Sequence, residues 1–146
     1  MTNRVKIALA LGLALMPLPG LAHIHIHPAT ATAGQTVDLA LLVGHGCAGA
    51  PTTALRVAIP EGLTAEPLAQ PGWQVTSGKG EIGWQGGPLP DHEKARFVLR
   101  ATLPADAHRI VFLPVVQVCG DQQLRWIDPD AAADHPAPAL QVLPKG

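Results

Sequence analysis

Three histidines alternate with isoleucines near the start of the sequence, where residues 23–27 read His-Ile-His-Ile-His. Side chains along a β-strand alternate between its two faces, so the imidazoles would share one face and the isoleucines would face the core. Imidazole nitrogen is a frequent ligand for transition metals. The alternative, which we favour for His25 and His27, is an exposed strand face with solvated histidines.

The residues before His23 have the three parts of a secretory signal. Arg4 and Lys6 precede an apolar run from Ile7 to Met16, and small residues lead up to Ala22. The run is shorter than the roughly 20 residues that span a bilayer comfortably, which argues against an uncleaved membrane anchor. We predict export and cleavage after Ala22, which would leave a free α-amino group on His23.

A free amine and an imidazole on one residue can chelate a single metal ion. Nitrogen donors of this kind suit Cu(II), which prefers square-planar or tetragonal sites. A competing mode uses His25, the third residue after cleavage, together with the amine and two deprotonated backbone amides. A paired strand would already use such amides, so we place this mode below chelation by His23 in the folded protein.

Two more residues are candidates for contact with a ligand. His45 lies between two glycines directly after a predicted strand, a position from which its ring could face a ligand. The same pattern is equally compatible with a tight turn in which the imidazole has no functional role. Trp126 has no lone pair to offer a metal, but its π face can cover a cation; the alternative is a core tryptophan. The polar or loop-like surroundings of three other histidines predict surface positions for His92, His108 and His135.

The two cysteines, Cys47 and Cys119, are 72 positions apart and form no CxxC motif. In an exported protein this favours a disulfide, with thiolate ligation of a metal as the alternative.

Proline and glycine together make up 30 of the 146 residues and separate short apolar or alternating runs. This spacing predicts an all-β sandwich formed as one domain by residues 23–146. The residues around Pro114 form one predicted buried strand, with the proline at an edge or bulge. Residues 128–138 are rich in Ala, Asp and Pro. They predict an irregular connecting segment before a last strand at the edge of a sheet. The predicted strands are 24–27, 36–43, 53–59, 72–76, 81–84, 94–102, 109–118, 122–127 and 138–143.

Composition excludes several functions. Removal of residues 1–22 leaves 8 basic and 11 acidic residues, a net charge of about −3 with neutral histidines, and no basic patch for nucleic acid. No second apolar stretch approaches membrane-spanning length. Both methionines, Met1 and Met16, leave with the signal, and no cysteine is closely followed by a histidine. This argues against a blue-copper electron carrier and a methionine-rich Cu(I) chaperone.

The sequence is similar to YcnI-like envelope domains along essentially the whole chain after residue 22. The resemblance starts with the His-Ile-x-Ile-x-Pro segment at residues 23–28. It continues, in order, through the nine residues His45–Thr53 and the tetrapeptide Ile59–Gly62. The remaining matching segments are Pro71–Trp73, Trp84–Pro90, Phe112–Cys119, Trp126-Ile127 and His135–Pro138.

This resemblance implies an immunoglobulin-like sandwich that binds Cu(II) through a single-histidine brace, meaning the amine and ring nitrogen of one N-terminal histidine. His23 would be the brace, and Trp126 would match the tryptophan beside the metal. Some relatives add a glutamate in the segment that corresponds to residues 43–51. This sequence has no acidic residue there, and His45 is our substitute candidate for the third ligand.

We therefore expect a periplasmic Cu(II)-binding protein, a carrier or chaperone in copper homeostasis whose partner would be another envelope copper protein. An oxidative copper enzyme is the enzymatic alternative, with His45 as a second brace histidine. The alternative without a metal is an immunoglobulin-like interaction module, because a sandwich of this kind hosts many roles.

Overall fold

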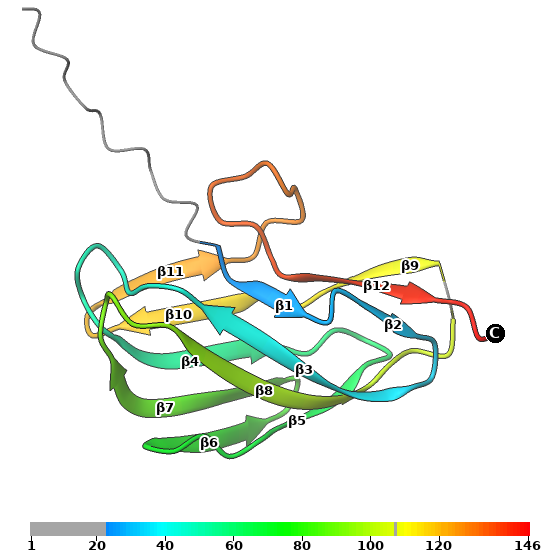
Figure 1. The fold of residues 1–146 in the computed structure, drawn as a ribbon, viewed down its shortest axis with the longest axis horizontal. Helices are drawn as coiled ribbons and strands as arrows, with labels where there is room; N and C mark the ends of the chain where they lie inside the picture. The colour runs from blue at the N-terminus through cyan, green and yellow to red at the C-terminus, as the bar shows by residue number, and fades with distance from the viewer. Residues whose placement is uncertain (1–22, 107) are drawn as a thin grey trace, which may run out of the picture.

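The computed structural model describes residues 23–106 and 108–146, so the predicted signal peptide lies outside the described residues. The described part folds into an all-β sandwich (Figure 1). Its strands are β1 (His25–His27), β2 (Thr30–Thr32), β3 (Thr36–Val43), β4 (Thr52–Ala58), β5 (Thr64–Pro67), β6 (Trp73–Gly78), β7 (Glu81–Leu89), β8 (Ala95–Thr102), β9 (Arg109–Phe112), β10 (Val115–Cys119), β11 (Gln122–Trp126) and β12 (Ala139–Leu143).

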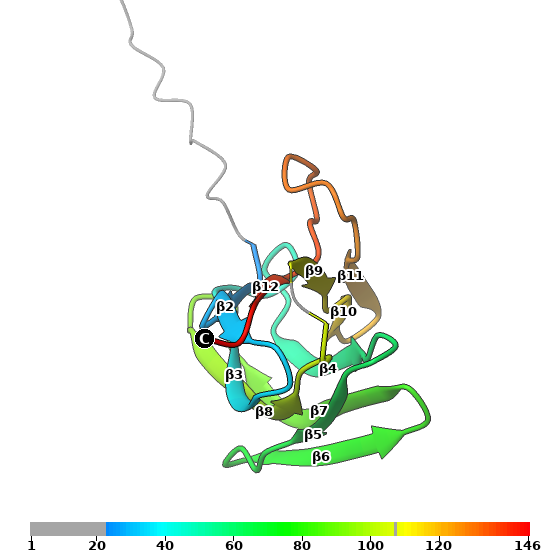
Figure 2. The ribbon, with the colours of Figure 1, turned by 90° about the vertical axis from the view of Figure 1, so that its right-hand side faces the viewer.

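Two sheets form the main layers. One has the order β1-β3-β8-β5 and the other β11-β10-β4-β7-β6, while β2-β12-β9 make a small third sheet beside them (Figure 2). Apolar side chains of both main sheets join a single core cluster. Its largest fully buried members are Trp84 and Phe97, whose rings lie 5.5 Å apart between centroids. The predicted fold class is therefore confirmed.

Strand β1 shows the predicted alternation. Ile24 and Ile26 are buried, whereas His25 and His27 are exposed. The strand is antiparallel to β3, with His25 opposite Leu42. The isoleucines thus fix the strand to the core and turn the histidines outward.

The predicted single strand at 109–118 is wrong. Residues 109–112 and 115–119 belong to different sheets, and the chain crosses between them at Leu113 and Pro114. There the Leu113 amide donates to the Pro138 carbonyl at 2.9 Å, and the Pro114 carbonyl accepts from Ala58 at 2.9 Å. Proline has no amide hydrogen for a ladder, so it marks the point where one strand ends.

The last strand also differs from the prediction, because β12 lies between β2 and β9 rather than at an edge. Residues 30–32 and 64–67 form short strands that the sequence pattern did not indicate. In the described residues, no helix has the length and apolar character needed to cross a membrane.

Candidate metal centre

Three histidine rings surround the indole of Trp126, the last residue of β11. The ring centroids of His23 and His45 lie 6.1 and 6.4 Å from it, both in edge-on arrangements. His135 is closer, at 4.8 Å. In Figure 1 the start of β1 lies beside the base of the loop that connects β11 and β12. The structure thus brings the predicted residues His23, His45 and Trp126 to one place.

Trp126 is only 2% exposed, so it is a core residue and a neighbour of the histidines at once. Its indole nitrogen donates a 3.0 Å hydrogen bond to Oε1 of Gln117, a buried residue of β10. Gln117 in turn donates from Nε2 to the His45 carbonyl at 2.7 Å and to Thr52 Oγ1 at 2.8 Å. One glutamine side chain therefore links the tryptophan to the segment that carries His45.

The segment 44–51 after β3 is anchored at several points. Cys47 forms the predicted disulfide with Cys119 at the end of β10, with Cα atoms 5.8 Å apart, so neither thiolate is available to a metal. The Gly46 amide donates to Asp91 Oδ1 at 2.9 Å. A Cβ at Gly46 would collide with the Ala50 carbonyl oxygen, so only glycine fits this close approach.

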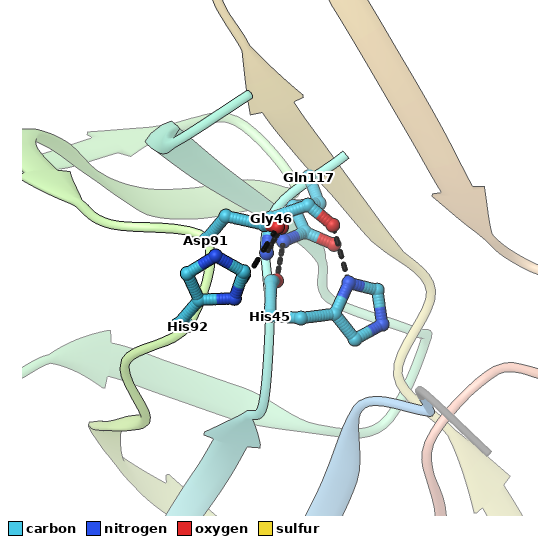
Figure 3. A network of polar contacts seen from close by, with 5 residues as sticks. All are labelled: His45, Gly46, Asp91, His92 and Gln117. Carbon is cyan, nitrogen blue, oxygen red and sulfur yellow. Dashed lines mark hydrogen bonds and ion pairs between the residues drawn. The ribbon is translucent and has the colours of Figure 1, made fainter. Parts of the chain in front are cut away.

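The His45 ring is also held locally, because its Nδ1 contacts the Gly46 carbonyl (Figure 3). The anchored backbone, rather than the turn alone, fixes the position of His45.

His135 is the member of this cluster that the sequence did not reveal. It was predicted at the surface but is half-buried against Trp126. Its carbonyl accepts a 3.3 Å hydrogen bond from Asp128, which helps to close the loop on which it sits. The exposed His92 and His108 agree with the prediction.

The side chains by themselves do not complete a metal cage. Among residues 23–106 and 108–146, no group of three or more His, Cys, Asp or Glu side chains is arranged to hold a metal ion. The donors next to Trp126 are imidazoles, which fit a nitrogen-preferring ion such as Cu(II) and not an oxygen-preferring ion such as Ca²⁺. A further nitrogen donor would appear at His23 only if the preceding peptide bond were cleaved.

An open groove of about 1200 Å³ borders the cluster. It extends from His23 and His45 over the outer face of β1, β3 and β8. The other charged or titratable side chains along it are His25, Asp91, His92, Lys94 and Arg96.

Known structures share the fold. An uncharacterized protein from Nocardia farcinica with an immunoglobulin-like fold is 25% identical, with a TM-score of 0.73, and the match covers 84% of this chain and 99% of that one. A cohesin module from a Clostridium perfringens family 33 glycoside hydrolase is 8% identical, with a TM-score of 0.54 and coverage of 85% and 99%. The latter likeness concerns the fold alone. A comparison with curated proteins gives no match.

The family comparison covers nearly all of the described chain. Residues 23–83 and 74–142 match a domain of unknown function, DUF1775, the family that includes the YcnI-like proteins. With its immunoglobulin-like sandwich and this match, the chain belongs to the DUF1775 family.

Proposed function

We propose that this protein binds Cu(II) in the cell envelope and acts as a copper carrier or chaperone. The ion would be held by the α-amino group and ring nitrogen of His23 after cleavage behind Ala22. His45 would supply a third nitrogen, and Trp126 would shield the site from water. The bound ion would contribute the redox and ligand-exchange chemistry of copper, while the protein contributes selection and positioning.

The observation that carries this proposal is the convergence of His23 and His45 on one buried indole. His23 lies two residues before β1. His45 lies in the segment after β3, which the disulfide and Gln117 hold in place. Two imidazoles and one amine make three nitrogen donors, a set that suits Cu(II).

The competing mode through His25 has less support. It requires deprotonated backbone amides at the start of the chain, and β1 pairs with β3 from His25 onward. Copper binding in that mode would detach this end of the strand from its sheet. We therefore retain His23 as the primary ligand and His25 as the competitor.

A copper titration of the exported protein tests the proposal. We expect one tight equivalent of Cu(II), with nitrogen hyperfine structure in the EPR spectrum. His23→Ala should abolish tight binding, and His45→Ala should weaken it and alter the spectrum. His27→Ala, on the same strand but absent from the cluster, is the matched control and should bind as the parent does.

Equal binding by the parent and His23→Ala would reject this site. Weak binding by every form would instead favour an immunoglobulin-like interaction module without a metal. Turnover of an added reductant and dioxygen by the copper-loaded protein, lost in His45→Ala, would favour the oxidative enzyme.

A further inference from the structure

The outer face of β1, β3 and β8 has a regular arrangement of side chains that continues beyond the candidate metal site. His25 is opposite Leu42 on β3, and Leu42 is opposite Arg96 on β8. Residues directly opposite each other in a sheet project on the same face. His23, Gly44 and Lys94 lie just beyond the paired residues of β1, β3 and β8, at the same end of the three strands. All six of these residues line the groove.

The groove therefore has two different walls and an open floor. His23 and His25 form one wall, and the cations Lys94 and Arg96, which follow Asp91 and His92 in the chain, form the other. The floor is Leu42 and Gly44, and a Cβ added at Gly44 would meet no atom within 4 Å. The missing side chain at Gly44 thus contributes depth to the groove.

The cationic wall is free to bind a ligand. Among the described residues, neither Lys94 nor Arg96 forms an ion pair, and both are exposed. The one carboxylate lining the groove, Asp91, already accepts a hydrogen bond from the Gly46 amide. With neutral histidines, two cations and one carboxylate leave the groove with a net positive charge, although the chain without residues 1–22 carries a net charge of about −3. A local charge opposite in sign to that of the whole molecule concentrates anions at the groove.

The two cations lie close together and favour a ligand with more than one anionic group. Lys94 directly precedes β8 and Arg96 is the second residue of this strand, so their Cα atoms are at most about 7 Å apart. Both side chains are long and exposed, so a ligand with several carboxylates can pair with each cation separately. Guanidinium groups bind carboxylates through two parallel hydrogen bonds.

We infer that this groove is a binding site for a small polycarboxylate, with its carboxylates on Lys94 and Arg96 and its carbon skeleton over Leu42 and Gly44. Its other end would lie beside His23. A polycarboxylate that carried a metal ion would thus present the ion to that histidine. This last step rests on the proposed function, whereas binding of the metal-free anion does not.

Calorimetric titration of the exported, metal-free protein with citrate at constant ionic strength tests the inference. We expect saturable binding of one citrate and about tenfold or weaker affinity for inorganic phosphate, which has no further carboxylates and no carbon skeleton to lie over Leu42 and Gly44. The double variant K94Q/R96Q should lose about tenfold or more in citrate affinity. The matched control R56Q/K79Q removes the same charges from exposed positions that do not line the groove, and should bind citrate as the parent does.

Gly44→Leu is a second, independent variant, because it fills the floor without removing a charge. It should weaken citrate binding while its melting temperature stays near that of the parent. Absence of saturable citrate binding, equal losses in both double variants, phosphate binding as tight as citrate, or full citrate affinity in Gly44→Leu would each overturn the inference. Copper binding is measured separately, so failure of either proposal leaves the other standing.

Discussion

At the scale of single residues, Gln117 is the polar centre of the candidate site. Its amide contacts the Trp126 indole, the His45 carbonyl and the Thr52 hydroxyl while it is almost fully buried. A buried polar network of this kind is stabilising only while every member has a partner. The identity of residue 117 therefore matters both for folding and for the position of His45.

Replacing Gln117 with leucine should cost stability, because it leaves the buried Trp126 N–H without an acceptor. An unsatisfied buried donor costs about 1–3 kcal/mol of unfolding free energy, which urea denaturation would measure. The control is Gln123→Leu, at an exposed position of β11, which should change stability by less. Equal stability of the parent and Gln117→Leu would contradict the network described above.

Trp126 should report metal binding by its fluorescence, because the candidate ligands lie against its ring. The other two tryptophans pack on Phe97 in the core instead. We expect Cu(II) to quench emission in the parent and in Trp73→Phe, and to quench much less in Trp126→Phe. Retained quenching in Trp126→Phe would place the metal elsewhere.

At the scale of elements, the disulfide couples the segment after β3 to the end of β10. It closes a loop with a sequence separation of 72 residues. On the chain-entropy model, closing a loop of this length stabilises the fold by roughly 4 kcal/mol. We expect the double variant Cys47→Ala/Cys119→Ala to unfold at a clearly lower urea concentration and to bind Cu(II) more weakly. An unchanged unfolding midpoint would show that other contacts hold the segment.

The cross-strand pair Asp38–Arg100 on β3 and β8 predicts a pH effect. Arg100 donates hydrogen bonds of 2.8 and 3.0 Å to Asp38, and this bonding lowers the pKa of the carboxyl from its ordinary value of 3.8. The stability that a lowered acid pKa contributes is present above the ordinary pKa and is lost as the pH falls through the lowered one. The effect should be small because the pair is exposed.

NMR titration of the Asp38 carboxyl carbon should therefore give a midpoint below 3.8 in the parent. Arg100→Gln should return it toward that value, while Arg56→Gln on the other sheet should leave it unchanged. A parent midpoint at or above 3.8 would contradict the bonding geometry.

Sequence patterns predicted the strands whose side chains alternate, such as 36–43 and 94–102, because burial of one face leaves a visible period. The run 109–118 was misread because it is almost wholly apolar, and such a run carries no signal for a change of sheet. The strands 30–32 and 64–67 are too short to show a period at all.

At the scale of the whole molecule, the fold gathers the site from segments far apart in the sequence. The disulfide was predictable because the sequence holds an isolated pair of cysteines. That His23 lies near Trp126 was implied only by the family resemblance. His135 and Gln117 were not predictable, because only the arrangement of β10, β11 and the loop before β12 brings them to Trp126. The groove was not predictable from the sequence either, because its two walls come together only through the pairing register of three strands.

The most direct test of the central claim compares Cu(II) affinity between the chain that begins at His23 and the same chain with one glycine added before it. The added residue keeps every side chain and removes only the α-amino group from His23. The account predicts tight binding by the first chain and a loss of at least about tenfold by the second, with altered nitrogen hyperfine structure. Equal affinity and identical spectra would contradict the claim that the amine of His23 holds the metal.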